Sequence, residues 1–299
     1  MNPLVTIAIP AYKAGRLHET IASALGQTHP NIEVVIVNDR SPEDIGAVVR
    51  QFSDSRIRYF VNEENVGRGD PSKNWNVCLR RAKGEWFCLL CDDDQYAPTF
   101  VETLLQLSER YPQCNVFRSC VRVTDGEYME VSRYPVSPEW ETTEQYMWAF
   151  YHSQRRQTIT EFMLRTSAMR DAGGYVNLPY AWGADNLSVF QFALQGGIAS
   201  TSECLAVFCD SGENISSDRR DMDRKLVTFQ QYIGKAKNMA RAHGFRADLF
   251  PVIDAYYQRA CMAHMTEADW QAFQHIVSQR HKLCISLKMI ILALLKRWI

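Results

Sequence analysis

Residues 32–39 read "IEVVIVND", an almost unbroken run of β-branched residues that ends in an aspartate. A strand with one face in water alternates apolar and polar residues, whereas this run is apolar at nearly every position. The run is therefore typical of a strand buried on both faces, as in a parallel sheet covered by helices. Asp39 then lies at the carboxyl end of that strand.

The sequence around this strand alternates between strand-like and helix-like segments. Ser41 and Pro42 are a typical cap and first residue for the helix that follows it. This alternation predicts an α/β fold, with a mainly parallel sheet flanked by helices. Over the first 111 residues we predict strands at 4–10, 32–39, 57–62 and 85–91, and helices at 14–27, 41–52, 72–83 and 98–111.

Residues 113–215 are less regular, and the chain from about residue 218 onward is helical in pattern. We therefore predict a sheet domain over 1–217 and a helical C-terminal extension over 218–299. In the irregular part we predict strands at 115–123 and 197–209, and a strand followed by a short helix within 157–175. In the extension we predict helices at 226–243, 248–265 and 267–278.

Composition and charge are those of an ordinary globular protein. The chain has 299 residues, 46% of them hydrophobic, and a formal net charge of -1. Such a balance creates no field that would attract nucleic acid, and we expect no nucleic-acid partner. The start of the chain has no basic segment of a signal peptide, and the nine cysteines are an odd number. Both features favour reduced cysteines and a cytoplasmic protein.

The last twenty residues combine basic and apolar side chains. No acidic residue follows Asp269, and Lys288 interrupts the apolar run "LCISLKMIILALL". A bilayer-spanning helix needs about 20 continuous apolar residues, so the segment does not fit a span. It fits a helix that lies on the surface of an anionic membrane, with Trp298 at headgroup depth. The alternative is a helix that docks on the protein itself or on a partner subunit.

Polar side chains follow several of the predicted strands. Tyr12 and Asp39 follow the first two, and Asp92–Asp94 follow the fourth. Ligands of such sheets bind beyond the carboxyl ends of the strands. An aromatic ring beside a carboxylate suits a nucleobase, and adjacent carboxylates suit Mg²⁺ or Mn²⁺ bound to substrate phosphates. A loop tyrosine, a helix-capping acid and a solvated acidic turn are the alternatives.

Three segments of the chain resemble the family 2 glycosyltransferases of the GT-A fold. They are "VTIAIPAYKAGRLHETIASALGQTHPNIEVVIVNDRSPED" (5–44), "NVGRGDPSKNWNVCLRRAKGEWFCLLCDDDQYAP" (65–98) and "AGGYVNLPYAWGADNLSVFQFALQGG" (172–197). The resemblance covers about residues 3–216. It implies inverting transfer of a sugar from a nucleotide-sugar donor, usually with Mg²⁺ or Mn²⁺.

The resemblance also implies roles for individual residues. The D-x-D region that binds donor ribose and metal corresponds to Asp92–Asp94, although Cys91 stands where the family usually has its first aspartate. Asp92 then contacts the ribose, and Asp93 or Asp94 binds the metal. The donor-nucleotide contacts implied in this way are Pro10, Ala11, Tyr12, Asp39, Asn65, Gly67, Asn76 and Asp92.

The motif "WGADNLSVF" resembles the acidic segment that ends in the family's catalytic base. Asp185 is the base implied here, and a residue that only caps the following helix is the alternative. Ala184 replaces the family's usual glutamate. An Arg and a His that often follow the next strand are also missing, and Cys209 and Ser211 stand near their positions.

These features together predict an inverting, metal-dependent glycosyltransferase of cell-envelope polysaccharide synthesis. Its donor would be a nucleoside diphosphate sugar, with a UDP-sugar favoured, and its acceptor a glycan or a lipid-linked sugar. The basic apolar tail would hold it on the inner face of the cytoplasmic membrane. Two alternatives remain: a nucleotidyltransferase, for which Lys13 and Arg16 could form a phosphate loop, and a non-catalytic membrane-bound partner subunit with a nucleotide pocket.

Overall fold

A computed structural model describes residues 2–212 and 221–264. The chain divides into two compact units, Met1–Asp218 and Arg219–Ile299. The expected domain boundary at residues 217–218, the expected helix at 267–278 and the basic apolar tail all lie outside the described residues.

In the first unit, one ten-stranded sheet runs in the order β3-β2-β1-β4-β9-β6-β10-β5, with β7 paired to β6 and β8 to β10. This sheet and its covering helices confirm the predicted α/β class. The strands are β1 Val5–Ala11, β2 Ile32–Asn38, β3 Ile57–Val61, β4 Trp86–Leu89, β5 Gln95–Tyr96, β6 Val116–Thr124, β7 Glu130–Arg133, β8 Trp140–Glu141, β9 Phe162–Arg165 and β10 Ile198–Cys209.

The described helices also follow the predicted order. In the first unit they are α1 Leu17–Leu25, α2 Ile45–Val49, α3 Ser72–Arg81, α4 Phe100–Arg110, α5 Thr143–Tyr151, α6 Thr166–Asp171 and α7 Ala184–Ala193. Two 3₁₀ turns accompany them, η1 Ile159–Glu161 and η2 Pro179–Ala181. The second unit contains α8 Met222–Ala242 and α9 Leu249–His264.

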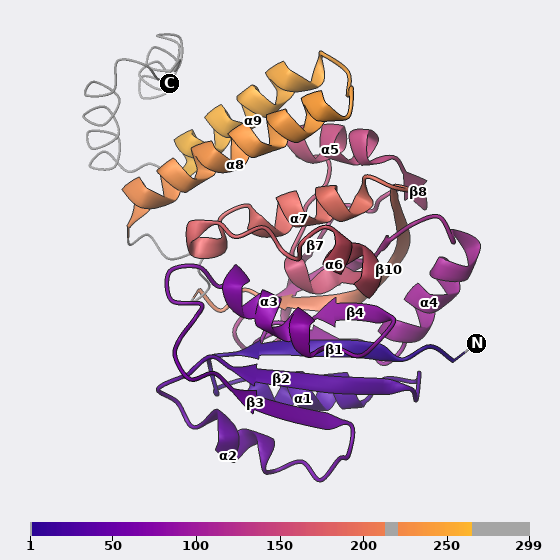
Figure 1. Ribbon diagram of the computed structural model, residues 1–299, viewed down its shortest axis with the longest axis vertical. Helices are drawn as coiled ribbons and strands as arrows, with labels where there is room; N and C mark the ends of the chain where they lie inside the picture. Colours follow the sequence, from indigo (N-terminus) through magenta and orange to yellow (C-terminus); the bar gives the residue numbers. More distant parts are fainter. Residues whose placement is uncertain (1, 213–220, 265–299) are drawn as a thin grey trace. The chain divides into compact units, whose positions relative to one another are not determined.

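The N-terminal half of the sheet is parallel, as predicted. β1 pairs with β2 and β4, and β2 pairs with β3, all in parallel register. Figure 1 shows β1 between β2 and β4. Beyond β4 the sheet is mixed, because β9 runs antiparallel to both β4 and β6. The carboxyl ends of β1, β2 and β4 therefore meet at one edge of the sheet.

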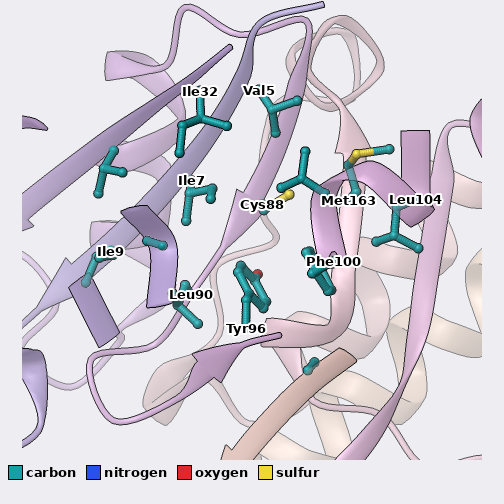
Figure 2. Packing of buried hydrophobic residues seen from close by; sticks show 14 of the residues in the cluster. Val5, Ile7, Ile9, Ile32, Cys88, Leu90, Tyr96, Phe100, Leu104 and Met163 are labelled. Carbon is teal, nitrogen blue, oxygen red and sulfur yellow. The ribbon is translucent and has the colours of Figure 1, made fainter. Parts of the chain in front are cut away.

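One face of the sheet packs against α1 and α4. The odd-numbered side chains of β1 join a buried cluster with Cys88 of β4 and Phe100 of α4 (Figure 2). Tyr96 stacks on Phe100 with ring centroids 3.8 Å apart, and its hydroxyl donates to the carbonyl of Thr160 at 2.8 Å. The stacking and the hydrogen bond of Tyr96 together fix β5, which directly follows the three aspartates.

The other face of the parallel half is covered by α3. Trp75 and Cys78 of this helix are buried, and Asn74 Nδ2 donates to the Val37 carbonyl of β2 at 3.4 Å. The ring of Tyr175 meets those of Trp75 and Phe87 at centroid distances of 5.5 and 6.4 Å. Apolar side chains thus bury both faces of the strands, which explains the unbroken apolar run in β2.

Helix α2 starts three residues later than the Ser-Pro pattern predicts. Ser41 is not its cap, because the Ser41 hydroxyl donates to the Tyr12 carbonyl at 2.5 Å and accepts the Glu43 amide at 3.0 Å. Asp44 takes the capping role, and its Oδ1 accepts the Ala47 amide at 2.8 Å. Ser41 instead ties the loop after β2 to the loop after β1.

The cysteines of the described residues are all free thiols. Burial raises the pKa of Cys88, and burial together with the neighbouring aspartates raises that of Cys91. A thiol with a raised pKa stays protonated, and the protonated form is a poor nucleophile and metal ligand. These two residues of the "CLLC" segment therefore behave as small apolar side chains.

The second unit begins with two packed helices, α8 and α9. The ring of Phe229 in α8 lies 5.4 Å from that of Tyr257 in α9, and Ile253 and Tyr257 are buried. Both predicted helices, 226–243 and 248–265, are thus present with slightly different ends. Of the helices in the described part of the chain, none combines the length and apolarity that a bilayer crossing requires.

Candidate active site

The polar side chains predicted to form a site lie at the carboxyl edge of the parallel strands. The Asp39 amide donates to the Ala11 carbonyl at 3.0 Å, and the Leu90 amide donates to that of Ala8 at 2.8 Å. These bonds fix the starts of the loops after β2 and β4 against β1. Pro10 lies just beyond the last pair of β1 with β4, where its missing N–H interrupts no further ladder bond.

We call Asp92, Asp93 and Asp94 the aspartate cluster. Asp92 faces the loop after β1, and its Oδ2 accepts the backbone amides of Tyr12 and Lys13, both at 2.7 Å. Burial and the charge of Asp93 raise the pKa of Asp92 to about 6, although the two amide bonds oppose this. Asp92 is thus ionised at neutral pH and holds the backbone beside Tyr12.

Asp93 pairs with the side chain of Lys13. The distance between Lys13 Nζ and Asp93 Oδ2 is 3.0 Å. Burial alone would lower the pKa of Lys13, but the charge and hydrogen bond of Asp93, together with the charge of Asp92, outweigh it and raise that pKa. Lys13 therefore stays a cation beside Asp93.

Asp94 points into the protein. It is fully buried, Thr160 Oγ1 donates to its Oδ2, and the Cys209 amide donates to its Oδ1 at 3.0 Å. Burial and the charge of Asp93 raise the pKa of Asp94. The three charges are therefore not equivalent, because Asp94 joins the β4 loop to η1 and β10.

A pocket of about 340 Å³ opens beside the aspartate cluster. Lys13 and Arg16 contribute cations to it, and the guanidinium of Arg16 lies 5.0 Å from the ring centroid of Tyr128. With two cations and three carboxylates, the described part of the lining has a formal charge of -1. The described lining residues are Lys13, Gly15, Arg16, Glu43, Asp92, Asp93 and Ser211.

Asp39 organises the loop after β3. Its Oδ1 accepts Asn62 Nδ2 at 2.7 Å and the Val66 amide at 2.9 Å, and its Oδ2 accepts the Gly67 amide at 2.8 Å. A Cβ on Gly67 would lie 2.5 Å from Asp39 Oδ2, so the close approach requires glycine. Asn65 lies in the same loop, where its carbonyl accepts the Arg68 amide at 3.4 Å.

Asn76 makes its contacts with a different loop. Its Nδ2 donates to the Tyr175 carbonyl at 2.9 Å, and its Oδ1 accepts the Tyr175 amide at 2.8 Å. Gly174 is required next to it, because a Cβ there would lie 2.4 Å from Asn76 Oδ1. Asn76 thus fastens α3 to the segment that leads to α7. Among the predicted donor contacts, Tyr12 is the exposed residue, with 42% of its surface accessible.

Asp185 lies in the first turn of α7, and this helix begins directly after Gly183, whose φ of 80° is left-handed. Burial raises the pKa of Asp185 to about 6, opposed by hydrogen bonds from the backbone amides of Asn186 and Asp185 itself. Gly183 is the N-cap residue of α7, so Asp185 does not occupy the capping position that the alternative assigned to it. A partly buried carboxylate with this pKa is a competent proton acceptor at neutral pH.

Asp185 and the aspartate cluster act on one side chain. Burial and the charge of Glu161 raise the pKa of Tyr134, and both Asp94 and Asp185 add to that effect. The guanidinium of Arg156 lies 5.8 Å from the ring centroid of Tyr134. The two acidic motifs, 91 residues apart in sequence, therefore lie within electrostatic reach of the same ring.

A buried ion pair that the sequence does not suggest lies behind these groups. Arg118 contacts Glu161 Oε1 at 2.6 Å and donates to the Tyr146 hydroxyl at 2.9 Å. Burial raises the pKa of Glu161 to about 7 in spite of the Arg118 charge. Glu161 follows Thr160, the residue that holds Asp94, so this pair supports the inner side of the site.

Three other residues of this site, Thr160, Lys13 and Arg16, were also not evident from the sequence as parts of it. Thr160 is 66 residues from Asp94, and no motif links the two positions. Lys13 and Arg16 suggested only the phosphate loop of a nucleotidyltransferase. Lys13 and Arg16 lie in the loop after β1, as Tyr12 does, and this shared position was the signal that could have placed them in the site.

The fold and this edge of acidic and aromatic groups define a class of protein. The sequence pattern of Glycosyl transferase family 2 matches residues 6–173, more than half of the chain, and the chain belongs to this family. The resemblance found in the motifs and the GT-A fold are therefore confirmed.

Individual relatives are similar over different lengths. TuaG of Bacillus subtilis, provisionally named a teichuronic acid biosynthesis glycosyltransferase, is 26% identical over 224 residues, which are 73% of this chain and 83% of TuaG. For two glycosyltransferases of Rickettsia typhi and Rickettsia bellii, by contrast, the chain covers only 36% and 14% of the relative's own length.

Two solved structures share the fold. TarS 1-349 of S. aureus in complex with UDP-GlcNAc has a TM-score of 0.62 at 16% identity, covering 78% of this chain and 66% of that one. The mannosyltransferase PcManGT from Pyrobaculum calidifontis, in complex with GDP-Man and Mn²⁺, has a TM-score of 0.57 at 15% identity, covering 99% and 84%.

Proposed function

We propose that the protein is an inverting glycosyltransferase that moves a sugar from a nucleoside diphosphate sugar to a hydroxyl group of a glycan or lipid-linked acceptor. The observation that carries the proposal is the pocket of about 340 Å³ beside Asp92 and Asp93, at the edge where Tyr12 and Asp39 also lie. Membership of family 2 supports this reaction class.

The nucleotide of the donor is proposed to bind along the loops after β1, β2 and β4. The exposed ring of Tyr12 can stack on a nucleobase, and Asp39 can accept a base N–H. Asp92 would contact the ribose, while Asn76 would act through the loop at Tyr175. We propose that Pro10, Ala11, Asn65 and Gly67, which lie in or next to the loops after β1 and β3, also contact the donor nucleotide. UDP is favoured, and because PcManGT binds GDP-Man, GDP is the alternative.

Mg²⁺ or Mn²⁺ is proposed to bind at the aspartate cluster. Residues 2–212 and 221–264 contain no group of three His, Cys, Asp or Glu side chains suited to a metal. These ions, however, are often held by one or two carboxylates together with substrate phosphates and water. Asp93 and Asp92 line the pocket and meet this need. The Mn²⁺ in the PcManGT complex is consistent with the proposal.

Such an ion would change the charge of the pocket from -1 to +1, counted over its described lining residues. When bound, it would neutralise charge on the departing diphosphate. The predicted ligand Asp94 would act indirectly, because it is fully buried, is not among the described lining residues of the pocket, and accepts hydrogen bonds from Thr160 and Cys209. We propose that Asp94 holds the turn that presents Asp93.

Asp185 is proposed as the general base. Because its pKa is about 6, its carboxylate is ionised at neutral pH and can accept the proton of an acceptor hydroxyl. The hydroxyl oxygen then bonds to the anomeric carbon from the side opposite the leaving diphosphate, which inverts the configuration. The α7 backbone amides that bind Asp185 would keep its carboxylate oriented during this step.

Membrane attachment is proposed for the basic apolar tail, which lies outside the described residues. A cell-envelope acceptor agrees with the name of TuaG, and a lipid-linked acceptor would be reached from the inner face of the cytoplasmic membrane. Removal of residues 281–299 should move the protein from the membrane fraction to the supernatant, because the apolar and basic contacts with lipid are lost. An unchanged distribution between the fractions would mean that the tail docks on protein.

A thermal-shift titration tests the donor site. UDP or GDP with Mn²⁺ should raise the melting temperature of the full chain, because a ligand at 100 times its Kd stabilises the folded state by about 2.7 kcal/mol. Mn²⁺ alone and pyrophosphate with Mn²⁺ are the controls for metal and phosphate binding. If no nucleoside diphosphate raises the melting temperature more than these controls do, the proposed donor site is wrong.

A further inference from the structure

The ion pair between Lys13 and Asp93 occupies the position where the proposed metal would bind. Lys13 Nζ lies 3.0 Å from Asp93 Oδ2, and the two side chains are 35% and 11% exposed. Asp92 accepts the backbone amides of Tyr12 and Lys13 at 2.7 Å, so the main chain of Lys13 is fixed. The ammonium group, by contrast, is at the end of four rotatable bonds.

Lysine is suited to changing partners in such a place. Its ammonium is a compact point charge with three donors on a flexible stem, whereas arginine offers a planar fork. A rotation of the stem can move the charge without moving the fixed backbone. Because Lys13 lines the same pocket as Arg16, phosphate oxygens that enter this pocket would lie within its reach.

The charges of the pocket indicate why Lys13 would change its partner from Asp93 to a diphosphate when ligands bind. Without the Lys13 ammonium, the described lining would carry a charge of -2 instead of -1, and Asp93 would lose its ion pair with Lys13. A diphosphate that enters adds further negative charge, and a divalent cation at Asp93 removes the need for the ammonium there. The ammonium then has a new anionic partner close by.

We propose that Lys13 is an exchangeable counter-ion. It neutralises Asp93 while the pocket is empty, leaves Asp93 when a divalent cation binds there, and then pairs with the diphosphate of the donor. This inference rests on the proposed function, because it takes a nucleoside diphosphate as the ligand of the pocket. It assigns Lys13 a role in donor binding and makes metal and nucleotide binding mutually dependent.

The exchange predicts two effects of opposite sign in Lys13→Met. Mn²⁺ alone should bind about three- to tenfold more tightly than to the wild type, because no ammonium competes for Asp93. UDP in the presence of EDTA should bind about three- to tenfold more weakly, because a cation near its phosphates is lost. A Lys13 that only stabilises the loop would weaken both ligands.

The test uses the full chain and three titrations: Mn²⁺ alone followed by electron paramagnetic resonance, UDP with EDTA by calorimetry, and UDP with Mn²⁺ by calorimetry. Lys13→Arg keeps the charge and should resemble the wild type more than Lys13→Met does. Lys235→Met, which removes an exposed lysine of α8, is the matched control and should change none of the three affinities. Melting curves of each variant show whether it is folded.

Unchanged or weaker Mn²⁺ binding in a folded Lys13→Met variant would overturn the exchange. Tighter Mn²⁺ binding with unchanged UDP binding would also overturn it, since the ammonium would then not reach the phosphates. If the wild type binds Mn²⁺ but neither UDP nor GDP under any condition, the proposed function fails instead. The Mn²⁺ titration still decides whether Lys13 competes with a metal in that case.

Discussion

Asp185→Asn should lower the rate of sugar transfer by at least about a hundredfold, and up to about ten-thousandfold, while the affinity for the nucleoside diphosphate stays within about twofold. An amide has nearly the shape of a carboxylate but cannot accept the proton of the acceptor hydroxyl. The donor nucleotide is proposed to bind at the ends of β1, β2 and β4, so its affinity should not depend on the general base Asp185.

The measurement for this variant is the initial rate of nucleoside diphosphate release at saturating donor, together with calorimetric titration of UDP or GDP. Asp171→Asn, which changes an exposed aspartate at the end of α6, is the matched control and should keep the wild-type rate. Transfer by Asp185→Asn at a rate close to that of the wild type would remove Asp185 from the role of base.

The same assignment fixes the direction of the pH dependence. Burial raises the pKa of Asp185 to about 6, and the base acts only when deprotonated. The value of kcat/KM should therefore be on a plateau above that pH and fall about tenfold per pH unit well below it. In Asp185→Asn the acidic limb of the residual rate should become shallower, and the part that persists is expected from Asp92, whose pKa burial also raises to about 6.

Asp39→Asn should weaken nucleotide binding at least about tenfold and lower the free energy of unfolding by about 2 kcal/mol. The Asp39 carboxylate accepts three hydrogen bonds, from Asn62 Nδ2 and from the Val66 and Gly67 amides. An amide in its place offers one oxygen and one NH₂ group, so a donor of the loop would face another donor. The charge that would bind a base N–H is lost as well.

Chemical denaturation and UDP titration separate these two consequences. Asp54→Asn is the control, since Asp54 is also an acid that accepts hydrogen bonds near a strand, from Arg56, but it lies outside the pocket lining. Its nucleotide affinity should equal that of the wild type. If Asp39→Asn loses stability but binds nucleotide normally, Asp39 only ties the loop after β3 and does not contact the base.

The parallel half of the fold could be predicted because its signals are local. The apolar run of β2 requires burial on both faces, and such strands place Tyr12, Asp39 and the aspartate cluster at one edge. The direction of β9 could not be predicted in this way. Its four residues pair with β4 and β6, which are distant in sequence, and a short apolar run is compatible with either direction.

The roles within the aspartate cluster depend on contacts that no local pattern encodes. Asp94 is bonded to Thr160 and to Cys209, 66 and 115 residues away in sequence. From the sequence alone, the three adjacent aspartates have no features that separate their roles. The hydrogen bonds to Thr160 and Cys209 distinguish Asp94 from Asp93. The Ser41 hydroxyl gives a similar case, because its bond to the Tyr12 carbonyl overrides a good capping pattern.

The identity of the product released from a nucleotide sugar tests the central claim most directly. The full-length protein with Mn²⁺ and either UDP- or GDP-sugars, with water or a glycan as acceptor, is predicted to release the nucleoside diphosphate and a sugar of inverted anomeric configuration. Asp185→Asn should release neither at a comparable rate. Release of a sugar 1-phosphate would contradict the account in favour of nucleotidyl transfer, and nucleotide binding without turnover of any donor would contradict it in favour of a non-catalytic subunit.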